Sequence, residues 1–152
     1  MSNTQFKDRV NKLLANGNRE FSTTLAVVAR IDNNSYEIYA VQSNSGAYVP
    51  GEKYALGDTL SREVFDNQLP VARNHIDNPT RTTLHPLYRS LPIECYIGAP
   101  IIVNGKPWGC VDFSSMAQRD GSFDKQHVDR INSLAAELGE LIDSVETGVQ
   151  PV

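Results

Sequence analysis

The chain has 152 residues, of which 40% are hydrophobic and 21% charged, and its formal net charge is −4. This length and composition predict one globular domain with a core that needs no disulfide or metal. A net negative charge offers no basic surface to a phosphate backbone, so nucleic acid is not an expected partner. The chain has no apolar run of about 20 residues, and residues 1–7 lack the apolar core of a secretion signal. We therefore expect a cytoplasmic protein that does not interact with a membrane.

The N-terminal segment predicts an amphipathic helix. Apolar residues between Thr4 and Ala15 recur with a period near 3.6 residues, and charged residues lie between them. The run Asn16-Gly17-Asn18 follows and is expected to end the helix, because glycine and asparagine are favoured just past a helix C-terminus.

Two strands and a turn are predicted next. Leu25–Ile31 is a continuous apolar run, residues 32–34 are Asp-Asn-Asn, and Tyr36–Gln42 alternates in polarity. These features are typical of a β-hairpin. Strict alternation predicts that Ala40 shares a face with Tyr36 and that Tyr39 lies on the other face.

The middle of the chain predicts short elements and a long loop. Gly57-Asp58-Thr59 resembles a helix start, and Leu69–Ala72 is long enough for a short strand. Arg73–Thr83 is polar and irregular, and loops of this length are usually functional or disordered. His85–Leu91 is expected to form a short helix that Pro92 ends.

A second hairpin is predicted from Ile93 to Ser115, with its turn at Asn104-Gly105. Pro100 lacks an N–H group, so we expect a bulge or a lapse in pairing there. A two-residue turn places Cys110 opposite Ala99. Cys95 then lies four residues further along, at a Cα separation from Cys110 of about 13 Å. A disulfide needs less than about 7 Å, so both cysteines are predicted to be free.

The last helix has clear start signals. Asp124 is expected to cap it, and Phe123 is expected to pack on Val128 as a hydrophobic staple. An apolar stripe continues to Val145. We place a single domain at residues 1–147 and a loose tail at 148–152. Hairpins in the middle and helices at both ends predict an α+β fold with an antiparallel sheet.

Several motifs, in this order and spacing, resemble those of GAF domains. They are Leu56–Thr59, His85–Tyr88, Cys95–Ile101, Gly105, Trp108-Gly109, Phe113 and Phe123-Asp124. The resemblance extends over nearly the whole chain and is closest to the sensory GAF domains of histidine kinases and diguanylate cyclases. It implies a GAF-like sheet with the terminal helices on one face and a small-molecule pocket on the other, closed by residues 58–92.

Asp112 is the main candidate for binding a ligand. It interrupts an apolar strand between Val111 and Phe113, and alternation puts it on the face of Cys110 and Trp108. A buried carboxylate needs hydrogen bonds, so Asp112 either makes a structural bond to loop backbone or anchors a ligand in an apolar pocket. The other candidates by position, each with an alternative role in packing or at the surface, are Tyr96, His85, Tyr88, Phe65, His75, Arg73 and Tyr39.

The resemblance also bears on cofactors. GAF domains bind cyclic nucleotides, bilins, haem, iron or small metabolites, or have lost ligand binding. His85 and Tyr88 are spaced as in the bilin-binding motif, but Leu84 stands where the attaching cysteine would be. His75, Asp77 and His85 have no recognised metal-ligand spacing. Neither a covalent bilin nor a metal is therefore expected, and the identity of any cofactor is left open.

Three functions remain open at this point. The first is a non-enzymatic sensor of an unidentified small molecule, which signals through a homodimer formed by the terminal helices and acts on an output domain in a longer protein. The second is a degenerate GAF domain that serves only as a dimerisation module. The third is a redox enzyme resembling free methionine sulfoxide reductases. That family's reactive cysteines are replaced here by residues 87–89 and 59–61, and Cys95 and Cys110 are expected to be core residues rather than redox sensors.

Overall fold

The computed structural model describes residues 2–43, 48–76, 93–116 and 121–146. The elements, in chain order, are α1 (Asn3–Phe21), β1 (Leu25–Asp32), β2 (Ser35–Ser43), β3 (Lys53–Ala55), η1 (Leu56–Asp58), α2 (Arg62–Asn67), β4 (Val71–Arg73), β5 (Cys95–Val103), β6 (Lys106–Ser115) and α5 (Lys125–Glu146). The strands form one antiparallel sheet in the order β3-β2-β1-β6-β5-β4. The predicted α+β class is confirmed. No helix in these residues is both long and apolar enough to cross a membrane.

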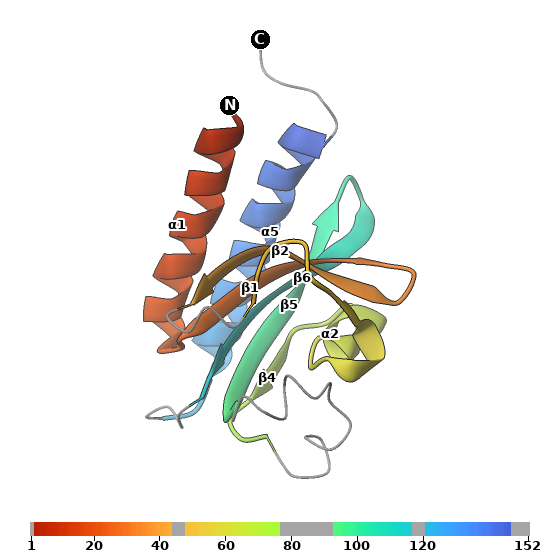
Figure 1. Ribbon diagram of the computed structural model, residues 1–152. Coiled ribbons are helices and arrows are strands. Elements are labelled where there is room, and N and C mark those ends of the chain that lie inside the picture. Colours follow the sequence, from red (N-terminus) through yellow and green to blue (C-terminus); the bar gives the residue numbers. More distant parts are fainter. Residues whose placement is uncertain (1, 44–47, 77–92, 117–120, 147–152) are drawn as a thin grey trace.

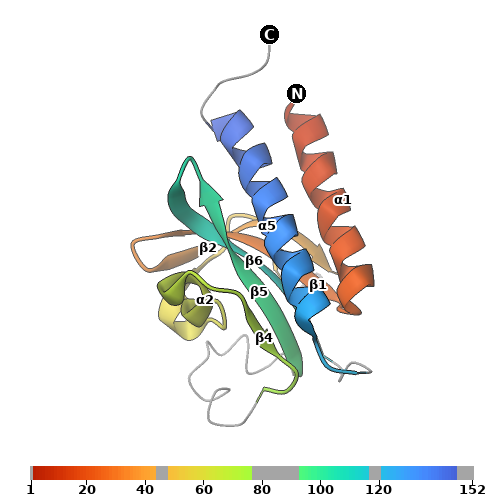
Figure 2. The same cartoon turned by 180° about the vertical axis from the view of Figure 1, so that it is seen from behind.

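The sheet has a separate apolar core on each face. Helices α1 and α5 lie side by side and antiparallel on one face, and α2 lies against the other (Figures 1 and 2). Ion pairs join the two long helices, from Arg9 to Glu137 at 3.4 Å and from Arg130 to Glu20 at 2.5 Å. We call the two sides of the sheet the helix face and the α2 face.

Helix α1 is longer than predicted, because packing overrides the stop signal. It continues through Gly17 to Phe21, and Ser22 ends it in the left-handed conformation. A Cβ atom at Gly17 would collide with the ring of Phe113 on the sheet. The glycine therefore lets α1 approach the sheet closely, and the prediction that it ends the helix was wrong.

The β5–β6 hairpin has the predicted turn, but the bulge expected at Pro100 lies between Ile101 and Ile102, and Pro100 itself pairs with Cys110. Asn104 and Gly105 have φ angles of 52° and 74°, as a tight primed turn requires. The register shifts between Ile101 and Ile102, and Trp108 on β6 is left without a cross-strand partner. This extra residue is a β-bulge, which turns the Trp108 side chain toward the helix face.

The bulge changes the pairing of Cys110 and the face on which Trp108 lies, and both differ from the prediction. Cys110 pairs with Pro100 rather than with Ala99, because one extra residue separates it from the turn. Trp108 lies on the helix face, whereas Cys110 lies on the α2 face, so the expected shared face of these two residues was wrong. The prediction that both cysteines are free is confirmed, and both are buried.

A second bulge lies between β1 and β2. Val28 pairs with Ala40 and Ala29 pairs with Ile38, which leaves Tyr39 as the extra residue. Tyr39 and Ala40 consequently both pack against the core of the helix face, whereas Ile38 is buried in the core of the α2 face. The expectation that Ala40 shares a face with Tyr36 and Ile38 was wrong, because a bulge interrupts strict alternation.

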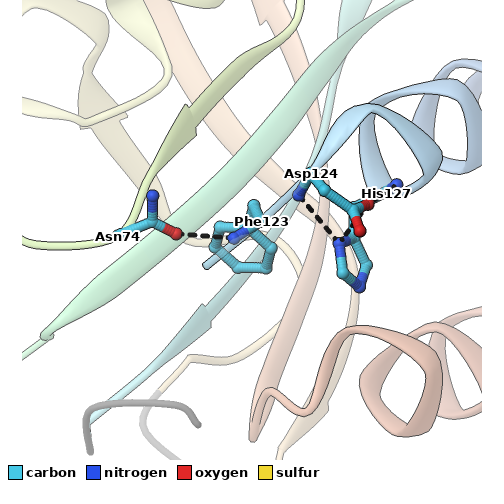
Figure 3. A network of polar contacts seen from close by, with 4 residues as sticks. All are labelled: Asn74, Phe123, Asp124 and His127. Atoms are coloured by element: carbon cyan, nitrogen blue, oxygen red, sulfur yellow. Dashed lines mark hydrogen bonds and ion pairs between the residues drawn. The ribbon is translucent and has the colours of Figure 1, made fainter. Parts of the chain in front are cut away.

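A reciprocal pair of hydrogen bonds begins α5 (Figure 3). The backbone N–H of His127 donates to Asp124 Oδ1 at 3.1 Å, and that of Asp124 donates to His127 Nδ1 at 3.0 Å. The expected cap at Asp124 is confirmed, with histidine in the place usually taken by Glu or Gln. Phe123 lies edge-on to the His127 ring, with ring centroids 5.7 Å apart, and its N–H donates to Asn74 Oδ1 at 2.7 Å. This last bond joins the start of α5 to the segment that follows β4.

Removing this cap should destabilise the domain measurably. We expect His127→Ala to lower the free energy of unfolding by about 1 to 2 kcal/mol, because the Asp124 N–H loses its acceptor. His127→Gln should recover at least half of that loss, since glutamine forms the same reciprocal pair. Urea denaturation of both variants checks the prediction, with Gln126→Ala at the exposed neighbouring position as control. Equal midpoints for His127→Ala and the unmodified protein would contradict it.

Candidate functional site

The most polar buried group on the α2 face is the Asp112 carboxylate on β6. The residue is 5% exposed, and three hydroxyl groups donate to it. Tyr36 and Ser61 donate to Oδ2 at 3.0 and 2.6 Å, and Tyr96 donates to Oδ1. The hydroxyls of Ser61 and Tyr96 also lie 3.3 Å apart. We call these four residues the Asp112 cluster.

Four separate elements position the cluster. Tyr36 and Tyr96 come from β2 and β5, and Ser61 immediately precedes α2. Although Ser61 occupies the N-cap position of α2, its side chain makes no capping bond and donates to Asp112 instead. Gly98 lies opposite Asp112 in the hairpin, and a Cβ atom there would collide with the Tyr96 hydroxyl. The missing side chain therefore leaves room for the Tyr96–Asp112 bond.

Burial governs the protonation of the cluster. It raises the pKa of Asp112 to about 6, against the opposing effect of the hydrogen bonds from Ser61, Tyr96 and Tyr36. Burial also raises the pKa of Tyr96 well above its ordinary value, and the nearby Asp112 charge adds to this effect. The Tyr96 hydroxyl therefore keeps its proton at neutral pH and can donate it in a hydrogen bond.

The thiol of Cys110 is close to Asp112 and is kept neutral. Burial raises its pKa well above the ordinary value, and the Asp112 charge raises it further. Cys95 is also fully buried. A reactive cysteine needs an accessible thiolate, and this environment disfavours one at Cys110.

Three other candidates lie along the β4 side of the α2 face. Arg73 on β4 is in register with Tyr96, and its guanidinium pairs with Glu63 of α2 at 2.5 Å. Phe65 of α2 is half-buried against the core of this face. Exposed His75 lies 3.9 Å from the carboxylate of Glu94. We call Glu63, Phe65, Arg73, His75 and Glu94 the rim.

Tyr39 is the candidate that the fold separates from the rest. It packs on the helix face, with its ring centroid 5.0 Å from that of Trp108 and 6.3 Å from that of Phe6. The structure thus brings Asp112 and Tyr96 together and places Tyr39 on the opposite face of the sheet. His85, Tyr88 and Asp77 lie outside the described residues. Within the described ranges, no group of three His, Cys, Asp or Glu side chains is arranged to hold a metal ion.

Tyr36 and Ser61 were not predicted as members of this site. They lie 76 and 51 residues from Asp112 in the chain. Strand alternation gave a usable signal for Tyr36, because it lies on a strand face with Ile38. The signal for Ser61 was misleading, because a serine just before a helix normally predicts a cap.

Comparisons with known proteins agree with this fold. A family model described as GAF domain matches residues 4–143. The GAF domain of an Acinetobacter phosphoenolpyruvate-protein phosphotransferase has a TM-score of 0.76 at 13% identity, over 96% of this chain and 87% of that one. The GAF domain region of a putative membrane protein from Geobacter sulfurreducens PCA has a TM-score of 0.73 at 21% identity, over 93% and 95%.

A photoreceptor domain has the same fold. The blue-light-absorbing form of the Thermosynechococcus elongatus PixJ GAF domain has a TM-score of 0.71 at 13% identity, over 97% of this chain and 90% of that one. Identities at this level show the fold and not the ligand. No curated protein matches the chain. The family model covers most of the sequence, so the chain belongs to the GAF domain family, a family of signalling and sensory domains.

Proposed function

We propose that this chain is a non-enzymatic, small-molecule-sensing GAF domain that signals through a homodimer. The observation that carries the proposal is the Asp112 cluster. Two of its donors, Tyr36 and Tyr96, belong to the sheet, whereas Ser61 belongs to the segment that covers the α2 face. A ligand bound between the sheet and the described part of this segment, residues 58–76, would displace this cover and change the Ser61–Asp112 bond.

The charges around the cluster indicate the kind of ligand. An ionised Asp112 only accepts hydrogen bonds, so it favours a ligand that presents a donor. The Arg73 guanidinium of the rim is already paired with Glu63, and the Glu94 carboxylate lies 3.9 Å from His75 Nδ1. We infer a small polar molecule of low net charge, whose apolar part packs against Phe65.

The buried thiols and the terminal helices support the rest of the proposal. Cys110 is held as a neutral thiol in the core, which disfavours a redox enzyme that needs an accessible thiolate. The start of α1 and the end of α5 lie at the same end of the molecule (Figure 2). Two copies that pair through these helices would bring four helix ends together, next to an output domain in a longer protein.

A dimerisation module without a ligand is the alternative. Both oxygens of Asp112 already accept hydrogen bonds from the protein's own hydroxyls. Leu60, Val64 and Ile76 from the covering segment are buried against the sheet. A ligand would have to displace some of these groups, and a domain that never does so would act through its helices alone.

Native mass spectrometry with an absorbance spectrum, on protein purified without added ligand, tests the two functions. It is followed by a thermal-shift screen with nucleotides and common metabolites. We expect an additional mass or a stabilising shift that Asp112→Ala abolishes and that Asp66→Asn, an exposed control on α2, retains. Ser61→Ala should weaken the response.

Sedimentation velocity on the same samples tests the dimer. A dimer with neither bound mass nor thermal shift would favour the dimerisation module. A monomer at high concentration would contradict both functions, because each requires pairing of the terminal helices.

A further inference from the structure

A groove of about 500 Å³ opens on the helix face, on the opposite side of the sheet from the Asp112 cluster. Its apolar walls come from α1, β2 and the last turn of α5, with Phe6, Val10, Tyr39 and Val145 among them. Small-molecule sites typically have volumes of about 300 to 1,000 Å³ and mostly apolar walls. We call this feature the helix-side groove.

A bulge turns an aromatic side chain into this groove. Tyr39 is the extra residue of the β1–β2 pair, and its ring packs edge-on against Phe6 on one side and Trp108 on the other. Bulges commonly re-aim a side chain next to a binding site. The pKa of Tyr39 is raised, first by burial and then by the charge of Glu146, so its hydroxyl stays a neutral donor.

One side of the groove is polar and carries a positive charge. Asn3, Lys7 and Asn11 are spaced four residues apart on α1, so they form a stripe beside the apolar pair Phe6 and Val10. The groove-lining residues in the described part of the chain include no carboxylate. Lys7 forms no ion pair with any charged side chain in the described part of the chain. Its ammonium group is therefore available to a ligand.

The charges at the two sides of the groove differ. Besides burial, the charge of Glu146 raises the pKa of Tyr39, against a smaller opposing effect of Arg30, and the Glu146 carboxylate accepts a hydrogen bond from Trp108 Nε1 at 3.1 Å. A negative head group is consequently disfavoured beside Tyr39 and favoured beside Lys7. The amide groups of Asn3 and Asn11 add hydrogen-bond donors to the Lys7 side.

We propose that the helix-side groove binds a small amphipathic organic anion, with its head group on Asn3, Lys7 and Asn11 and its apolar body against Phe6, Tyr39 and Val145. This site is independent of the ligand proposed for the α2 face, because the sheet separates the two. A ligand in this site contacts the first turns of α1 and the last turn of α5. Its binding would therefore hold the start of α1 and the end of α5 together.

Fluorescence titration tests the proposal with a matched pair of probes. Anilinonaphthalene sulfonate is an aromatic anion, and phenylnaphthylamine has nearly the same apolar body without the sulfonate. Trp108 is the sole tryptophan and contacts Tyr39, so energy transfer from it reports a probe bound to the protein, and the comparison of two lysine variants locates that probe at the groove. Lys7→Glu reverses the charge on the polar side of the groove, and Lys12→Glu makes the same change at an exposed position of α1 outside the groove.

We expect Lys7→Glu to weaken binding of the sulfonate at least tenfold, while Lys12→Glu changes it less than twofold. Binding of phenylnaphthylamine should be unchanged in both variants, and Asp112→Asn should leave both probes bound. Equal effects of the two lysine substitutions, or the absence of energy transfer from Trp108, would overturn the proposal. It would also be overturned if binding disappeared as the protein dimerised, because a second copy would then cover the groove.

Discussion

Replacing Asp112 with asparagine should remove a pH dependence from the stability of the domain. Burial raises the pKa of this carboxyl group from 3.8 to about 6, so the folded state binds the proton more tightly than the unfolded state. The free energy of unfolding therefore falls as pH rises from about 4 to 6, by about 3 kcal/mol for a shift of about two pKa units. Above about pH 6, Asp112 is ionised in both the folded and the unfolded state, so the free energy of unfolding no longer falls through this group.

The measurement is urea denaturation at a series of pH values between 4 and 7. We expect the free energy of unfolding of Asp112→Asn, minus that of the unmodified protein, to rise by about 3 kcal/mol across this range. Asp66→Asn removes an exposed carboxylate of α2 and is the matched control for the loss of one carboxyl group. Parallel curves for Asp112→Asn and the unmodified protein would show that Asp112 titrates as a solvated carboxylate.

The second large effect is expected at Gly109, where β6 passes β1. A Cβ atom at this position would overlap the carbonyl oxygen of Ala29 and lie 3.2 Å from the Cα atom of Arg30. Both atoms belong to the backbone of a strand held between β2 and β6, so neither can move without breaking sheet hydrogen bonds. Gly109→Ala should therefore destabilise the domain by about 3 kcal/mol or more.

Two other glycines provide matched comparisons. A Cβ atom at Gly57 meets no atom within 4 Å, so Gly57→Ala should leave the stability nearly unchanged. Gly17→Ala should lie between the two, because the added methyl group meets the side chain of Phe113 rather than backbone. Thermal and urea unfolding of the three alanine variants measure the order of their stabilities. A Gly109→Ala domain as stable as Gly57→Ala would show that the two strands can separate at little cost.

The two predicted hairpins and α5 were recognisable from sequence because their signals are local. Asn104-Gly105 tolerates positive φ angles, and the Asp124 side chain reaches the N–H group three residues later. The GAF family was recognised from motifs whose order and spacing follow from this local structure. Asp112 was identified because a carboxylate within an apolar strand needs partners.

The sequence did not predict which residues form hydrogen bonds with Asp112. Tyr36 and Ser61 meet Asp112 only after β1 has paired with both β2 and β6 and α2 has packed against the sheet. Ser61 even carries a local signal for another role, at the N-cap of α2, which the structure does not use.

Local sequence patterns were enough to place the two hairpins and α5 and to identify the family, since these depend on neighbouring residues and their order. Which side chains share a face of the sheet became clear only from the packed fold. Bulges at Tyr39 and Trp108 shift the alternation by one residue, and nothing in either strand's own pattern marks them. A bulge forms where the paired strands and the helices packed on them require it, so its position depends on contacts between distant parts of the chain.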